Sequence, residues 1–341
     1  MQSNGKSKKY NTCVLVAPLF GIKLSKDVNH EFEIEGVTLI SKSKLMNSRV
    51  SKRLGLQKKF KEYRCFHEDT ETFAVYKKNI PALQDKVNVI NQFKVLTLEL
   101  TYILCATQIS IPDIKRRSVL QLYYGNADIR VDTLIDNLDV PAESMTRSTR
   151  PRYYNYLTIN KKLLKKESEH GFLTAFMGLA KSDMSPKMRA SIRSCIVFLG
   201  HSQNSIEPYV RFLNNMIAID SILTTSDAKH KETAQQNLES FFGWSDLWNN
   251  EFHREKVNEI YRLRSGLVHD GKISCITESD VIYTEFLLKN LLYNFCRFPE
   301  VFKNKEVLSI FIKNIQAERT LGIPSTKSKF LPKKFRYFHT F

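Results

Sequence analysis

The spacing of apolar residues changes along the chain, from a strand-like pattern in the first part to a helical pattern in the second. Apolar positions predict strands over 11–17 and 30–41, and Pro18 is expected to end the first. Gly36 predicts a bulge or a tight bend. The run 91–110 is rich in threonine and aromatic residues, which favours a strand over a buried helix. We therefore expect the first part to be β-rich or mixed.

From about residue 160, apolar residues recur every three or four positions, as on the buried face of a helix. This spacing predicts helices over 188–200, 206–223, 234–242 and 301–315, and a further one from Val257. The sequence Thr277-Glu-Ser-Asp280 has the pattern of a capping box, so another helix is expected to begin there. The broad apolar face of that helix is typical of a bundle centre or a dimer interface.

Turn and linker residues gather between 140 and 156, where proline, serine and threonine are frequent. A chain of 341 residues is long enough for two domains. We predict an α+β protein with three parts. These are a β-rich or mixed N-terminal recognition domain over 1–150, an all-α helical domain over 151–316, and a basic, aromatic tail over 317–341.

An excess of positive charge marks the chain, with 52 lysines and arginines against 35 acidic residues and a formal net charge of +17. Such an excess attracts nucleic acids, although a lysine-rich proteome would give the same composition. A membrane surface is a weaker alternative, because no basic amphipathic helix stands out. The six cysteines are far apart and form no Cys-x-x-Cys pair, which fits a reducing cytoplasm.

Several classes of function are disfavoured by the motifs that the chain lacks. No apolar run is long enough to predict a membrane span. The chain has no Gly-rich phosphate loop and no nucleophile elbow, which argues against an ATPase or a serine hydrolase. The cluster from Cys65 to Glu71 is interpreted as a polar turn, so we expect neither a metal site nor a cofactor.

Basic residues interleaved with aromatic rings form three candidate RNA contacts. The window 42–64 fits either a phosphate-binding patch or a solvated helix or loop. The segment near residue 150 fits an RNA contact or a plain linker, and the tail fits a grip on single-stranded RNA or docking onto the protein itself. The candidate RNA-binding residues are Lys52, Arg53, Lys58, Lys59, Arg150, Arg152, Lys333, Lys334 and Arg336.

The stretch 257–271 carries the most distinctive polar residues of the chain. Two arginines and a histidine, Arg262, Arg264 and His269, interrupt an apolar stripe near its end. Gly271 can adopt the left-handed conformation that commonly ends a helix. The apolar residues of the stripe, which we expect to be buried, are Val257, Ile260, Tyr261, Leu267 and Val268.

The string Tyr261-x-x-Arg264-Ser265-x-x-Val268-His269 resembles the motif of HEPN domains of the ApeA-like branch. The resemblance covers about residues 165–316, although the branch usually has glycine directly after the histidine, where this chain has Asp270. It implies a helical, cytoplasmic, metal-independent endoribonuclease with Arg264 and His269 as catalytic residues. It also implies a symmetric homodimer with a composite cleft and an abortive-infection role in anti-phage defence. A phage-derived trigger and a tRNA or single-stranded RNA substrate would fit that role.

The chemistry of RNA cleavage suits these residue types. RNA carries its own nucleophile, the 2′-hydroxyl, so cleavage needs proton transfers and stabilisation of the phosphate charge. Histidine titrates near neutral pH, and the charged fork of arginine can donate two hydrogen bonds to a phosphate. His269 would transfer the protons and Arg264 would hold the phosphate.

Helix geometry leaves a second arginine open. On a continuous helix Arg262 lies nearly in line with His269, whereas Arg264 lies about 140° away from it. This argument for Arg262 fails if the helix ends before His269. Supporting residues could be Glu259, Ser265 and Asp270, or these could be ordinary solvated helix residues. The alternatives to a ribonuclease are a non-catalytic RNA-binding or scaffold protein and a metal-dependent nuclease that uses N-terminal acids.

Overall fold

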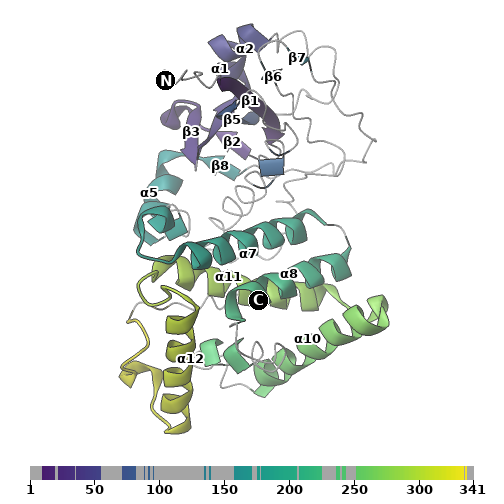
Figure 1. Cartoon of the computed structure of the whole chain (residues 1–341), viewed down its shortest axis with the longest axis vertical. Helices are drawn as coiled ribbons and strands as arrows, with labels where there is room; N and C mark the ends of the chain where they lie inside the picture. Colours follow the sequence, from purple (N-terminus) through teal and green to yellow (C-terminus); the bar gives the residue numbers. More distant parts are fainter. Residues whose placement is uncertain are drawn as a thin grey trace, which may run out of the picture. The chain divides into compact units, whose positions relative to one another are not determined.

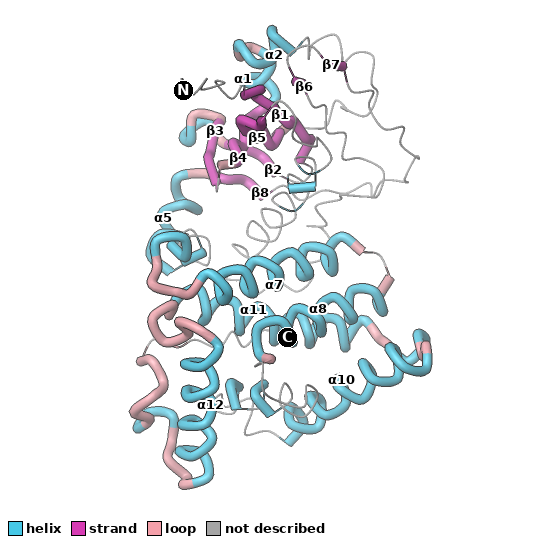
Figure 2. Tube along the Cα trace, in the orientation of Figure 1, coloured by secondary structure: helices cyan, strands magenta, loops and turns pink. Residues whose placement is uncertain are grey.

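The computed structural model separates into two compact units, and the last division between them along the chain falls between Glu169 and His170. The strands belong to the N-terminal unit, and the C-terminal unit is helical (Figure 2). The fold is therefore α+β, as predicted. The residues described are 10–19, 22–34, 36–54, 71–81, 88, 91–92, 95, 134–135, 138–139, 157–170, 175–176, 178–205, 207–224, 236–238, 240–242, 251–333 and 335.

A six-stranded antiparallel sheet organises the N-terminal unit, in the order β3-β4-β5-β1-β6-β7. Its strands are β1 (Tyr10–Leu19), β3 (Glu31–Ile34), β4 (Val37–Ser41), β5 (Thr72–Pro81), β6 (Leu134–Ile135) and β7 (Leu138–Asp139). A parallel pair stands beside it, made of β2 (Ile22–Leu24) and β8 (Leu157–Ile159). Short helices complete the unit: η1 (Lys26–Val28), α1 (Lys42–Met46), α2 (Arg49–Leu54) and α5 (Lys161–His170), which reaches the unit boundary.

The strand predictions are confirmed in part. Gly36 has φ of 80° and forms the turn of the β3–β4 hairpin, so the predicted bend is correct. Pro18 does not end β1, because it still lies opposite Phe73 of β5. The described part of β6 pairs only with Cys13 and Val14, so β1 has one described neighbour at Pro18, where a missing N–H is tolerated.

The predicted strand over 91–110 is wrong wherever its residues are described. Asn91, Gln92 and Val95 are helical. An apolar run has no period that separates a buried helix from a buried strand, and threonine and aromatic content did not decide the matter. The remaining residues of this run lie outside the described part of the chain.

The C-terminal unit is a bundle of long helices (Figure 1). Its elements are η3 (Leu179–Lys181), α7 (Pro186–Asn204), α8 (Pro208–Leu223), α10 (Glu251–Asp270), η4 (Ile273–Cys275), α11 (Glu278–Arg297), α12 (Lys305–Thr320) and η5 (Ser325–Lys327). Residues 236–238 and 240–242 are also helical. The helices expected from residue 188 onward are thus confirmed, with ends shifted by a few residues.

Local signals in the sequence explain where these helices begin. Pro186 and Pro208 stand at the first helical position of α7 and α8, where the missing N–H costs nothing. Thr277 and Asp280 form the predicted capping box, in which each side chain accepts a hydrogen bond from the backbone N–H of the other residue. Asn304 caps α12 by accepting a hydrogen bond from Val307 N at 2.8 Å.

Helix α8 packs against both α7 and α11. α11 is buried over most of its circumference, which fits the expectation that it lies at the centre of a bundle. Its polar residues are paired: Thr284 accepts from Asn215 of α8 at 3.1 Å, and Glu285 accepts from Arg211 at 3.1 Å. Phe295 of α11 stacks on Phe302 in an aromatic core. These contacts hold α8 and α11 together, and α10 forms ion pairs with both of these helices.

Candidate functional site

Helix α10 is continuous through the motif and ends at Asp270. Gly271 follows with φ of 65°, the predicted left-handed residue that stops the helix. Val257, Ile260, Tyr261 and Leu267 are buried as predicted. Val268 was expected on the same stripe but is 54% exposed. Val268 lies in the last turn of α10, and at this position no described neighbouring element covers its side chain.

Arg264 is held against the neighbouring helix α8. Its Nη2 lies 2.7 Å from Oδ2 of Asp220, and the two side chains are 31% and 20% exposed. The Tyr261 hydroxyl donates a hydrogen bond to the other carboxylate oxygen of Asp220 at 3.4 Å. The Arg264 Nε atom is buried and makes no hydrogen bond. Asp220 therefore sets the direction of the guanidinium and leaves only part of it open to a ligand.

Arg262 and His269 lie on the outer face of the same helix, and both are exposed. Because α10 is helical through both positions, their side chains leave the axis about 20° apart, one above the other. Arg264 leaves about 140° from His269. Within one chain, the structure thus groups Arg262 with His269 and turns Arg264 toward α8.

The supporting residues proposed from the sequence have different environments. Glu259 pairs with Lys256 at 2.8 Å, and Lys256 also contacts Asp280 at 2.6 Å. Glu259 is thus committed to an ion-pair cluster that joins α10 to the start of α11. Asp270 pairs with Lys272 just beyond the helix end at 3.0 Å. Ser265 stands beside the groove described below.

Burial and pairing shift the pKa of two groups in this cluster. Burial alone would raise the pKa of Asp280, but hydrogen bonds from Lys256 and Thr277 outweigh it and lower the pKa. Burial alone would lower the pKa of Lys256, but its hydrogen bonds to Asp280 and Glu259 raise it. Both residues therefore stay charged over a wide pH range, which keeps α10 attached to α11.

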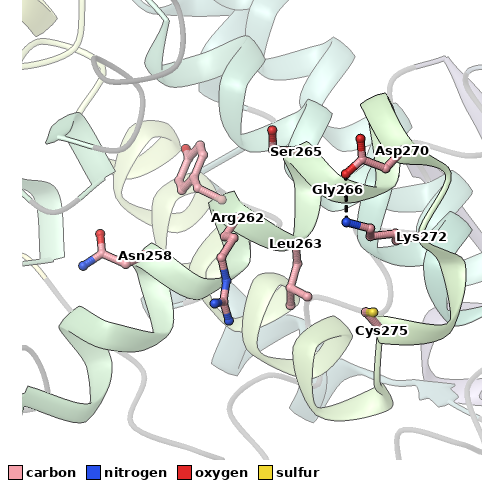
Figure 3. A pocket seen from close by; sticks show the side chains of 9 residues that line it. Asn258, Arg262, Leu263, Ser265, Gly266, Asp270, Lys272 and Cys275 are labelled. Atoms are coloured by element: carbon pink, nitrogen blue, oxygen red, sulfur yellow. Dashed lines mark ion pairs between the residues drawn. The ribbon is translucent and has the colours of Figure 1, made fainter.

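Two grooves run along the exposed side of α10. The larger, of about 520 Å³, lies between α10 and the segment that follows it, and Figure 3 shows its lining with the Asp270–Lys272 ion pair at one end. The smaller, of about 430 Å³, lies nearer the start of the helix. Asn258 and Arg262 line both. The remaining lining residues of the larger groove are Tyr261, Leu263, Ser265, Gly266, Asp270, Lys272 and Cys275.

The structure describes three of the basic residues proposed for RNA contact, and none of these three lines a groove beside α10. Lys52 is exposed on α2, and Arg53 follows it in the same helix. Lys333 is exposed in the tail. Phe335 packs against Phe241 with ring centroids 5.2 Å apart, so the tail docks onto its own domain at this point. The positions outside the described residues are Lys58, Lys59, Arg150, Arg152, Lys334 and Arg336.

No pattern in the sequence singles out Asp220, Asn258 or Lys272. Asp220 follows two apolar residues, Ala218 and Ile219, on a predicted helix. An acidic residue next to residues expected to be buried was the one feature of the sequence that could have indicated its role. Asn258 and Lys272 are ordinary surface residue types. They line one groove because the chain turns back after Gly271, which no local pattern specifies.

Comparisons with protein-family models, with curated proteins and with solved structures give no match. In the described part of the chain, no helix has both the length and the apolar character that crossing a membrane requires. Among the same residues, no three His, Cys, Asp or Glu side chains gather in a way that could hold a metal ion.

Proposed function

We propose that this protein is a metal-independent endoribonuclease of the HEPN type, with its site at the end of α10. The observation that supports this most strongly is that an exposed arginine and an exposed histidine, Arg262 and His269, lie on one face of α10. A second arginine, Arg264, is fixed close by through Asp220. The motif string from Tyr261 to His269 and the net charge of +17 agree with an RNA substrate.

In the proposed reaction, His269 transfers protons and an arginine holds the phosphate that becomes crowded with negative charge. The attacking group is the substrate's own 2′-hydroxyl, so the mechanism needs no metal, and DNA lacks the nucleophile. Arg262 shares a helix face with His269, about 10 Å away along the axis, which supports contact of both residues with one RNA strand. Arg264, the arginine that the family resemblance selects, could reach a phosphate only through the part of its side chain that Asp220 leaves exposed.

A second copy of the chain would supply the missing proton-transfer group. Cleavage requires a base for the 2′-hydroxyl and an acid for the departing 5′-oxygen. In a two-fold dimer, the two copies of His269 could take these two roles, and Arg264 of one copy could serve the other. The resemblance adds the biological context: a cytoplasmic toxin for abortive infection that cuts tRNA or single-stranded RNA after a phage-derived trigger.

The test is to incubate the purified protein with tRNA and with single-stranded RNA in EDTA. We expect cleavage by the wild type, loss of about 10²–10³-fold in rate for Arg262→Ala or Arg264→Ala, and a comparable or larger loss for His269→Ala. His201→Ala and Arg254→Ala are matched controls, because both residues are exposed helical residues away from the motif's end. Cleavage that needs metal, or that survives His269→Ala, would reject the mechanism.

A non-catalytic RNA-binding or scaffold protein is the second candidate. The ion pair of Arg264 with Asp220, directed away from His269, favours it, because the arginine of the motif is then a structural residue. This candidate predicts salt-sensitive RNA binding without turnover, unchanged by His269→Ala. Measuring binding and cleavage on the same samples distinguishes the two candidates.

A further inference from the structure

The larger groove beside α10 has the size and lining of a binding site for one nucleotide. Its volume of about 520 Å³ falls within the range of roughly 300–1,000 Å³ that small-molecule sites occupy. All of its lining residues come from α10 and from the segment that ends at Cys275. The site is thus built within one stretch of chain, in which Lys272 N donates a hydrogen bond to Gly266 O at 3.2 Å.

The charge of the groove favours an anionic ligand. Arg262 and Lys272 contribute two cations against the single carboxylate of Asp270, which Lys272 already contacts at 3.0 Å. The smaller groove differs, because Glu255 and Glu259 balance its two cations. A phosphate is therefore attracted to the larger groove and not to the smaller one.

The uncharged lining offers separate surfaces for a base. Leu263 supplies an apolar contact, and Figure 3 shows its side chain extending from the same side of α10 as Arg262. The amide of Asn258 has both donors and an acceptor, so it can hydrogen-bond the edge of an unpaired base. A base on Leu263 with its phosphate near Arg262 would use every class of group in the groove.

The position of the groove connects it to the proposed reaction. Arg262 lines the groove and shares a helix face with His269, seven residues later or about 10 Å along the axis. We infer that this groove binds one nucleotide of a single-stranded RNA next to the phosphate presented to His269, and that its lining determines which base is accepted there. This inference rests on the proposed ribonuclease function, which it extends from chemistry to substrate selection.

A substitution at Gly266 allows the groove to be closed without replacing Arg262 or His269. A Cβ added there would meet Lys272 Cδ at 3.6 Å, an ordinary contact, so Gly266→Ala fits and leaves the groove open. The larger side chain of Gly266→Phe would extend into the groove and occupy it. Gly266→Ala is the matched control, and a thermal unfolding curve checks that both variants are folded.

The binding test uses 2′-O-methyl trinucleotides with each of the four bases at the centre, which cannot be cleaved by 2′-hydroxyl attack. In calorimetric titrations we expect the wild type and Gly266→Ala to bind with a base preference of about tenfold. We expect Gly266→Phe to bind at least tenfold more weakly. If Gly266→Phe binds all four trinucleotides as the wild type does, the inference is overturned.

A second pair of variants keeps the test independent of how Gly266→Phe folds. Lys272→Glu reverses the charge of the groove at an exposed position. Lys313→Glu makes the same change in net charge on the exposed face of α12, outside the groove. Only Lys272→Glu should weaken trinucleotide binding, by about tenfold, and equal effects would overturn the inference by showing general electrostatic attraction alone.

Cleavage-site sequencing separates failure of the inference from failure of the proposed function. If the wild type cuts RNA and Gly266→Phe cuts it with the same base preference and rate, the proposed ribonuclease function is supported and the nucleotide site is rejected. If trinucleotides bind as expected but no RNA is cut, the nucleotide site is supported and the proposed ribonuclease function is rejected. If Gly266→Phe changes the oligomeric state in sedimentation and leaves trinucleotide binding unchanged, the groove is a protein contact and the inference is wrong.

Discussion

Asp280 holds two helices at once, so its loss should cost more than the loss of an ordinary helix cap. Its Oδ2 accepts hydrogen bonds from Thr277 N at 2.8 Å and from the Thr277 hydroxyl at 2.6 Å, while Oδ1 contacts Lys256 Nζ at 2.6 Å. The side chains of Lys256 and Asp280 are 14% and 3% exposed. Asp280→Ala removes all three contacts together.

The magnitude follows from these contacts. Losing a cap costs about 1 kcal/mol, and leaving one partner of a buried ion pair alone costs about 3–5 kcal/mol. Lys256 keeps Glu259 as a partner at 2.8 Å, which offsets part of the second cost. We expect Asp280→Ala to lower the free energy of unfolding by about 3 kcal/mol, out of a total of about 5–15 kcal/mol. Asp280→Asn, which keeps an acceptor for Thr277, should cost less.

The assay is urea unfolding followed by circular dichroism, with a double-mutant cycle between Asp280→Ala and Lys256→Met. The coupling free energy should be about 1–3 kcal/mol. Ser279→Ala, an exposed residue in the same turn, is the control and should change stability by less than about 0.5 kcal/mol. The reasoning is refuted if Asp280→Ala matches this control, or if the cycle shows no coupling.

Three further predictions concern other contacts. Burial lowers the pKa of Lys305 from 10.5 to about 8. Between these two pH values the unfolded chain binds more protons at this residue than the folded chain, so the free energy of unfolding rises with pH. From pH 7.5 to 9.5 the wild type should gain about 2 kcal/mol relative to Lys305→Met in urea unfolding, and parallel pH curves would contradict this. Asp220→Asn should cost about 1–2 kcal/mol, between the values for exposed and buried pairs, and a stability equal to wild type would show that Arg264 does not depend on it. Phe335→Ala should lower the melting temperature by several degrees, because its ring packs against Phe241 and Phe298. An unchanged melting curve would show that the tail does not contribute to the stability of the core.

Local chemical signals made the helical unit largely predictable. The Thr277–Asp280 capping box and the glycine at 271 act over one helical turn, so their residue types were sufficient to place two helix ends. Apolar spacing placed α7, α8 and α11 because each has a face that must be covered. Val268 was misassigned because the helix ends two residues later, and its spacing alone continued the buried stripe.

The parts of the site that the sequence could not predict depend on contacts between distant residues. Asp220 pairs with Arg264 from a helix that ends well before α10 begins, and no spacing rule links the two. The continuity of α10 through His269 keeps Arg262 in line with the histidine, a point that the sequence left open because the helix could have ended earlier. Lys272 lines the same groove as Asn258 only because the chain turns back after Gly271.

The carboxylate of Asp280 both binds Lys256 of α10 and caps the start of α11. A movement of one helix therefore affects the other. If a ligand draws α10 outward far enough to separate Lys256 from Asp280, the first turn of α11 loses part of what holds it in register. The reverse also holds: fraying at Thr277 would loosen the grip on α10. A strand of RNA that drew α10 outward in this way would be expected to speed amide hydrogen exchange at the start of α11, whereas one that held α10 in place would slow it.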